Sequence, residues 1–172
     1  MANAKIETTS ERGYWLMKSE PEALSIETLK KKRSHYWDGV RNYQARNYMR
    51  DDMQIDDSVI FYHSSAEPSG VAGIAKVSRL AYPDFTQWDK KSAYYDPKSS
   101  KAEPIWHMVD VAFVEQFPRV ITREELAGNV KLRGMKLWTH RRLSIIPLSK
   151  REFIEIVRLA RKAVSARKPV QK

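Results

Sequence analysis

Short apolar runs separated by turn-forming residues dominate this chain, and they predict strands more often than helices. The clearest run is Ser58–Tyr62, and residues 71–80 predict a second strand that pairs with it as a hairpin across the turn-rich segment 63–70. Residues 14–18 predict a first strand that ends before Pro21, because proline cannot extend a β-ladder. The first half of the chain is therefore expected to supply several neighbouring short strands.

Three further segments predict extended structure. Residues 106–113 alternate between two faces well enough for a central strand, which Pro118 is expected to close. Residues 143–146 predict a last short strand ended by Pro147, and residues 35–37 predict an extended segment that runs into a turn. The strands are thus spread over the whole chain.

Polar N-cap residues mark the starts of the helices, since their side chains can accept hydrogen bonds from unpaired backbone N–H groups. The expected helices run over residues 26–32 after Ser25, 43–49 after Asn42, 123–128 after Thr122, and from 150 onward after Ser149. Thr122–Glu125 and Ser149–Glu152 also have the capping-box spacing. All these helices except the last are short.

Together these elements predict an α+β fold with a small, mainly antiparallel, barrel-like sheet flanked by short helices, because few of the strands are separated by full crossover helices. The 172 residues suit one domain with one core. We expect a single domain over residues 13–164, between a flexible N-terminal tail at 1–12 and a basic C-terminal tail at 165–172. The oligomeric state stays open, and a monomer of this length can fold alone.

Composition narrows the chemistry and the compartment. The chain has no cysteine, which excludes disulfide frameworks, thiolate nucleophiles and cysteine-ligated zinc. No apolar segment has the length of a membrane span, and the N-terminal residues lack the apolar core of a signal peptide. We therefore expect a soluble intracellular protein of the cytoplasm or nucleus, with no membrane partner.

The charge balance is strongly basic and uneven. The net charge is +10, and all of the excess lies in residues 87–172, which carry 19 Lys and Arg against 9 Asp and Glu. Such an excess is typical of proteins that bind a polyanion, although a basic surface kept for solubility has the same composition. Arg133, Lys136, Arg141 and Arg142 lie near Trp138 in the sequence and are the candidates for phosphate contacts.

The stretch Trp37–Asn47 has the most unusual composition. It combines a Trp, an Asp-Gly turn, two Arg, two Asn and a Tyr, a mixture too polar for a core strand and too aromatic for an ordinary surface loop. The segment 82–104 is a second unusual feature, because a loop of this length that carries Trp88, Tyr94 and Tyr95 is more often functional than disordered. We interpret the first stretch as the floor of a ligand pocket and the second as a source of its lid.

Seven segments in order along the chain resemble the EVE domain family. They are residues 14–21 (YWLMKSEP), 37–42 (WDGVRN), 61–64 (FYHS), 82–84 (YPD), 95–98 (YDPK), 106–111 (WHMVDV) and 142–145 (RLSI). The resemblance implies a PUA-like fold, related to YTH and ASCH domains, and a function in binding modified bases of DNA or RNA by accepting a flipped nucleobase. It implies no catalytic activity and no required cofactor.

A pocket for a flipped base needs an aromatic face, because stacking on one side chain returns about 1–3 kcal/mol and roughly offsets the cost of unstacking. Trp37 is the first candidate for this face, although a buried core Trp is the alternative. Tyr95 is the candidate from the loop. Val40, with Leu16, is the candidate for an apolar recess that holds an added methyl group.

Ser19 and Asn42 are the candidate readers of the base edge, since both can donate and accept hydrogen bonds. Their local alternatives are a turn for Ser19 and a helix N-cap for Asn42. The supporting wall is expected to include Trp15, Lys18, Glu20, Arg41, Tyr62, His63 and Ser64. For His63 a structural histidine is the alternative.

Three rival functions use the same residues. An enzyme could employ Lys18, Glu20, Asp38 and His63 as acid and base, but the chain has no metal-spacing motif, nucleophile elbow or Gly-rich phosphate loop. A small-molecule sensor could hold a free nucleoside in the pocket. A general RNA binder could use the edge of the sheet and leave the pocket idle.

Overall fold

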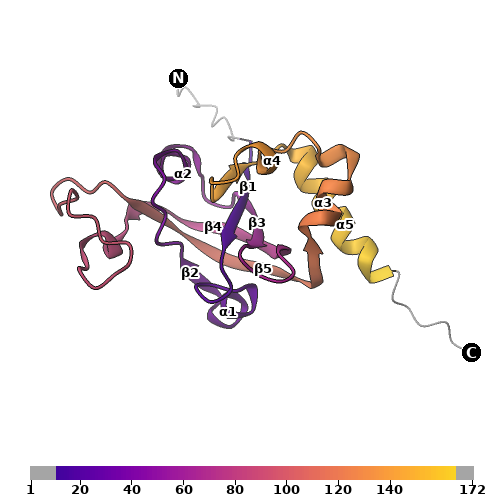
Figure 1. The fold of residues 1–172 in the computed structure, drawn as a ribbon, viewed down its shortest axis with the longest axis horizontal. Helices are drawn as coiled ribbons and strands as arrows, with labels where there is room; N and C mark the ends of the chain where they lie inside the picture. Colours follow the sequence, from indigo (N-terminus) through magenta and orange to yellow (C-terminus); the bar gives the residue numbers. More distant parts are fainter. Residues whose placement is uncertain (1–10, 166–172) are drawn as a thin grey trace, which may run out of the picture.

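The computed structural model describes residues 11–165, and its framework is a six-stranded sheet in the order β2-β5-β4-β3-β1-β6 (Figure 1). The strands are β1 (Tyr14–Ser19), β2 (Ser34–Tyr36), β3 (Ser58–His63), β4 (Gly70–Pro83), β5 (His107–Thr122) and β6 (Ile145–Pro147). Neighbouring strands run antiparallel except β1 and β3, which are parallel. The α+β class and the mainly antiparallel sheet are confirmed, and the sheet is open, with β2 and β6 at its edges.

The helical elements are short apart from the last. They are α1 (Ile26–Lys32), α2 (Tyr43–Asn47), the π-helical turn η1 (Tyr48–Asp52), η2 (Phe85–Trp88), α3 (Arg123–Gly128), η3 (Val130–Leu132), α4 (Lys136–Thr139) and α5 (Lys150–Ser165). The caps form as expected: Ser25 accepts from Thr28, Asn42 accepts from Ala45, and both capping boxes close. No helix in the described part of the chain is long and apolar enough to cross a membrane.

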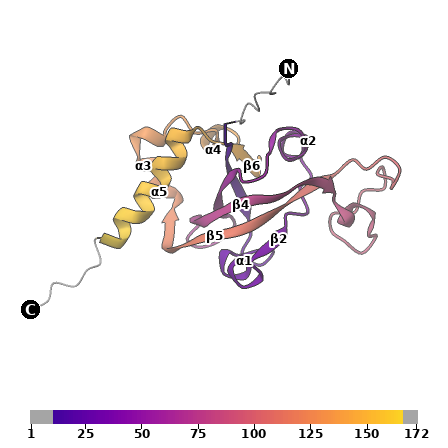
Figure 2. The same cartoon turned by 180° about the vertical axis from the view of Figure 1, so that it is seen from behind.

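The two ends of the long β4–β5 pair carry different structures. Figures 1 and 2 show α3 and α5 together at one end and the segment 84–106 projecting at the other. The expected tails, 1–12 and 165–172, lie almost wholly outside the described residues. The β1–β3 pair lies between these two ends, next to the edge strand β6 (Figure 1).

Strand β5 runs past Pro118, so the prediction that this proline closes the strand is wrong. Gln116 pairs with Gly73 and Ile121 pairs with Val71, so the register shifts over the residues between them. Pro118 lies in this irregular stretch, where no ladder hydrogen bond needs the N–H that proline lacks. A bulge of this kind depends on the partner strand and is invisible in the sequence of β5 alone.

The core explains the continuous apolar run in β1. This strand lies inside the sheet between β3 and β6, and the adjacent residues Leu16 and Met17, which point to opposite faces, are both fully buried. Asp57, just before β3, ties the start of β1 to this core. Its buried carboxylate accepts from the Gly13 amide at 2.7 Å, the Trp15 indole N–H at 2.8 Å and the Gln54 amide at 2.9 Å.

Replacing Asp57 tests this anchor. Asp57 is only 2% exposed, and Asp57→Ala leaves the buried Trp15 indole N–H and two part-buried amides without their acceptor, so we expect the free energy of unfolding to fall by about 3 kcal/mol. Urea denaturation measures the change. The control is Asp51→Ala, which removes an exposed carboxylate paired with Arg50 and should leave the stability nearly unchanged. Equal effects of the two substitutions would contradict the anchor.

Candidate nucleic-acid interface

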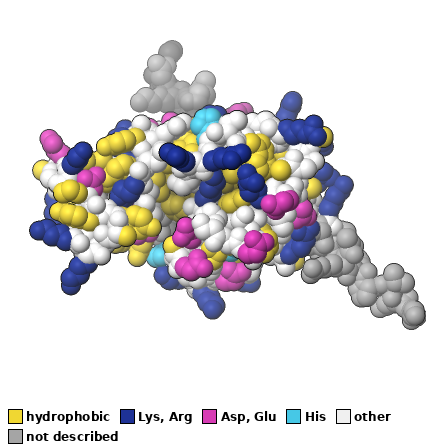
Figure 3. Space-filling model, in the orientation of Figure 1, with side chains coloured by type: hydrophobic (Ala, Val, Ile, Leu, Met, Phe, Trp, Pro, Cys, Tyr) yellow, Lys and Arg dark blue, Asp and Glu magenta, His cyan; other side chains and the backbone are white. Residues whose placement is uncertain are grey.

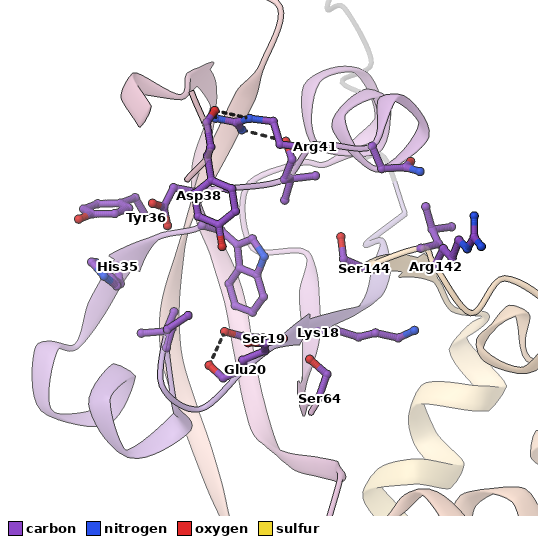
Figure 4. Close-up of a pocket in the computed structure, with 18 of the residues that line it drawn as sticks. Lys18, Ser19, Glu20, His35, Tyr36, Asp38, Arg41, Ser64, Arg142 and Ser144 are labelled. Atoms are coloured by element: carbon purple, nitrogen blue, oxygen red, sulfur yellow. Dashed lines mark hydrogen bonds between the residues drawn. The ribbon is translucent and has the colours of Figure 1, made fainter. Parts of the chain in front are cut away.

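A cavity of about 680 Å³ opens where β1 ends (Figure 4). Its lining comes from the end of β1 and the following turn, from residues 35–42, from Ser64 and Tyr94, and from residues 141–144 before β6. This volume is in the usual range of small-molecule sites, about 300–1,000 Å³. The stretch interpreted as a pocket floor therefore does line a cavity.

Trp37 belongs to both the core and the cavity. Its backbone N–H donates to Val109 O at 2.8 Å, which continues the pairing of β2 with β5. Its indole is 5% exposed and packs edge-on against Phe61 with ring centroids 5.3 Å apart, yet the residue lines the cavity. Trp37 is therefore both a core residue and part of the cavity wall.

Arg41 holds the cavity wall together rather than facing a ligand with free donors. A guanidinium has five N–H groups, and here each has a protein acceptor. Nε and one terminal nitrogen donate to Tyr94 O at 2.9 and 2.7 Å, and the remaining N–H groups donate to Val40 O, Asp84 and Thr86. The side chain therefore fastens the segment 84–106 to the cavity wall.

Asp84 is the buried partner in this arrangement. Its carboxylate is 0% exposed and accepts from the Gly39 amide at 2.8 Å, from Arg41 at 2.9 Å and from the Thr86 amide at 2.8 Å. Burial alone would raise the pKa of Asp84, but the hydrogen bonds from Thr86, Arg41 and Gly39 hold it below its usual value. The ionised, fully bonded carboxylate fixes the turn at Gly39.

Gly39 is needed at this turn for two reasons. Its φ of +76° lies in the left-handed region that favours glycine. A Cβ on it would also lie 2.7 Å from the ring of Tyr94. The Tyr94 ring therefore packs against the turn, while its carbonyl is held by Arg41, and this brings Tyr94 to the cavity.

Asp38 lines the cavity beside this turn, with its carboxylate on the side of Tyr36 (Figure 4). Burial and the neighbouring Asp84 carboxylate raise its pKa above the ordinary value. Within the described residues, the carboxylate accepts a hydrogen bond only from its own backbone. The same residues contain no group of three acidic or histidine side chains placed to hold a metal ion.

The opposite side of the cavity is basic. Lys18, Arg141 and Arg142 line it, and the Lys18 ammonium donates to Arg141 O at 3.3 Å. Burial and the positive charge of Arg123 lower the pKa of Lys18 below its ordinary value. Figure 3 shows Lys and Arg side chains gathered on this face, over β1 and α4.

Ten of the residues singled out from the sequence line the cavity. They are Lys18, Ser19, Glu20, Trp37, Val40, Arg41, Asn42, Ser64, Arg141 and Arg142. The local roles of two of them are also observed: Asn42 Oδ1 accepts from the Ala45 amide at 3.0 Å, and Ser19 donates to the Glu20 carbonyl at 3.2 Å. Asn42 thus keeps its amide N–H groups for another partner.

Four expected wall residues lie elsewhere. Trp15 donates to Asp57, Tyr62 is buried in the core, and His63 accepts the Ile26 amide through Nε2 at 3.1 Å, so it holds the start of α1. Tyr95 does not line the cavity; the neighbouring Tyr94 lines it instead.

Two expected phosphate contacts, Arg133 and Lys136, are exposed outside the cavity lining. The lining also includes Asp38 and Gly39, which lie within the predicted floor, and seven residues that were not singled out as pocket candidates: Ala23, Leu24, His35, Tyr36, Tyr94, Leu143 and Ser144. Most of them adjoin a predicted residue in the chain, so the segments were identified more reliably than the individual side chains.

Comparison with known proteins agrees with this fold. The EVE domain pattern matches residues 13–159. Thymocyte nuclear protein 1 of mouse is 45% identical over 165 residues, 85% of this chain and 73% of the relative, and the human protein is 43% identical over 171 residues, 88% and 76%.

Two solved structures extend the likeness. A hypothetical protein from Leishmania major has a TM-score of 0.87 at 49% identity and covers 90% of this chain and 98% of its own. Human THYN1 in complex with DNA containing 5-methylcytosine has a TM-score of 0.80 at 43% identity and covers 86% and 97%. The PUA-like α+β fold is confirmed, and this chain belongs to the EVE domain family.

Proposed function

We propose that this protein binds DNA without catalysing a reaction and accepts a flipped, modified cytosine in the cavity. The observation that carries the proposal is the cavity itself, which joins an aromatic floor, a carboxylate without a partner side chain and a basic wall. The human relative crystallised with DNA containing 5-methylcytosine supports the ligand class. We expect the protein to act where such DNA is found, in the nucleus or cytoplasm.

Trp37 would supply the stacking face for the base. Unstacking a base from a duplex costs a few kcal/mol, and one aromatic contact returns about 1–3 kcal/mol. Tyr94, which is 42% exposed and held by Arg41, would close over the base from the other side. Two aromatic contacts exceed the cost of flipping, so the remaining polar contacts can provide selectivity.

Asp38 would read the base as cytosine. The cytosine edge presents an amino donor at N4, whereas thymine presents an acceptor at the same place. An ionised carboxylate accepts hydrogen bonds and cannot donate them, so Asp38 would favour cytosine and repel thymine. The free N–H groups of Asn42 would serve the acceptor positions of the base.

An apolar part of the lining would hold the added methyl group. Leu24, Val40 and Leu143 line the cavity and are otherwise buried. Burial of one methyl group contributes about 0.8 kcal/mol, which is roughly a fourfold gain in affinity. The preference for 5-methylcytosine over cytosine should therefore be modest.

Titration of short duplexes followed by fluorescence anisotropy tests the proposal. We expect a duplex with one 5-methylcytosine to bind roughly fourfold more tightly than its unmodified counterpart. Trp37→Phe should lower the affinity for the modified duplex and leave a duplex with an abasic site unaffected, because only the base meets Trp37. Equal binding of modified and unmodified duplexes, in DNA and in RNA, would contradict base reading.

Asp38→Asn tests the cytosine contact. The amide can donate as well as accept, so we expect discrimination against thymine to fall by about 1–3 kcal/mol, measured with free cytidine and thymidine analogues or with mismatched duplexes. Asp52→Asn, an exposed position outside the cavity, is the matched control. Because the pKa of Asp38 is raised, binding of the parent should also weaken on acidification sooner than an ordinary aspartate allows.

Arg41→Lys tests the hydrogen bonds by which Arg41 holds Tyr94 and Asp84 at the cavity wall. Lysine keeps the charge but cannot make the five hydrogen bonds, so Tyr94 and Asp84 lose their common partner. We expect the free energy of unfolding to fall by about 2 kcal/mol and the affinity for the modified duplex to fall several-fold. Arg50→Lys, at an exposed ion pair, is the control. Unchanged stability and binding in Arg41→Lys would refute this role of the Arg41 hydrogen bonds.

A further inference from the structure

Three cations, Lys18, Arg141 and Arg142, line the basic end of the cavity. A fourth, Arg123 at the start of α3, lies outside the lining; its amide donates to Ser69 O at 3.0 Å, and its positive charge helps to lower the pKa of Lys18. Among the ion pairs of the described residues, none involves any of these four side chains. Their positive charge is therefore available to a ligand.

Neighbouring groups hold two of these cations. The Lys18 ammonium donates one N–H to Arg141 O and keeps two. The Arg123 guanidinium lies 5.5 Å from the ring centroid of Trp138, whose indole N–H donates to Leu132 O. Lys18 and Arg123 therefore lose less side-chain entropy on binding an anion than unrestrained side chains would.

The cavity is chemically polarised. Figure 4 shows Lys18 and Arg142 on one side and His35, Tyr36 and Asp38 on the other. A simple anion would make favourable contacts only with the cationic side, and a neutral base would make them only with the aromatic and carboxylate side. A ligand with a base at one end and a phosphate at the other matches both.

We propose that Lys18, Arg123 and Arg142 form a phosphate site that holds the phosphate of the flipped nucleotide itself, so that the cavity binds a nucleotide as one unit. This inference rests on the proposed function and deepens it, because it assigns an anion site to the interior wall. Glu20 also lines the cavity, and its Oε1 accepts from Ser65 Oγ at 3.0 Å.

Calorimetry with free ligands tests the phosphate site. We expect 5-methyl-2′-deoxycytidine 5′-monophosphate to bind the full chain on the order of tenfold more tightly than the nucleoside at low salt, because charge-assisted hydrogen bonds to phosphate are strong there. The combined change of Lys18→Gln and Arg142→Gln should reduce the ratio of the two affinities to about one, and Arg123→Gln should reduce it in part. Lys90→Gln with Lys91→Gln removes the same charge away from the cavity and should keep the full ratio.

Three outcomes would overturn the phosphate site. They are equal affinities of nucleoside and monophosphate in the parent, a ratio that survives the Lys18 and Arg142 changes, and a ratio that the Lys90 and Lys91 changes abolish. Inorganic phosphate separates this inference from the proposed function. Inorganic phosphate should shift the NMR signal of the Lys18 ammonium in the parent protein. In the double variant Arg123→Gln with Arg142→Gln, the same signal should not shift. Both results are expected whether or not a methylated duplex binds. An unshifted signal in the parent would refute the site alone.

Discussion

The buried hydrogen-bonded pair of Arg41 and Asp84 is the interaction on which the cavity depends. A buried ion pair stabilises a fold only when its remaining donors and acceptors are also satisfied, since desolvation otherwise exceeds the Coulomb attraction. Here every N–H of Arg41 has an acceptor, and Asp84 accepts from three residues. The pair therefore works as a rigid joint between the cavity wall and the segment 84–106, reinforced by the Arg41 guanidinium 5.4 Å from the centroid of Trp106.

This joint explains how one short stretch serves both packing and recognition. Trp37 continues the pairing of β2 and packs in the core, Asp38 lines the cavity, and Gly39 allows the left-handed turn that follows. Lys18 arrives from the end of β1 on the other side. In the proposed complex, base contacts and phosphate contacts would come from separate elements, so that mutation would alter selectivity and affinity independently.

The sequence predicts the parts of this structure that local rules control. Apolar runs and capping residues located the strands and helices, and the odd composition of residues 37–47, with the family resemblance, located the cavity wall. Contacts between distant segments were not predictable. Tyr94 rather than Tyr95 faces the cavity because Arg41 binds the Tyr94 carbonyl across 53 positions, and an irregular loop has no periodicity that separates two adjacent tyrosines. His63 likewise meets an amide of α1 that is 37 positions away.

A crystal structure of this chain with a duplex containing one 5-methylcytosine would show whether the modified cytosine leaves the duplex and enters the cavity. We expect the methylated base between Trp37 and Tyr94, with its N4 amino group within hydrogen-bond distance of the Asp38 carboxylate. A complex in which the methylated base stays stacked in the duplex while the cavity holds no nucleotide would contradict it.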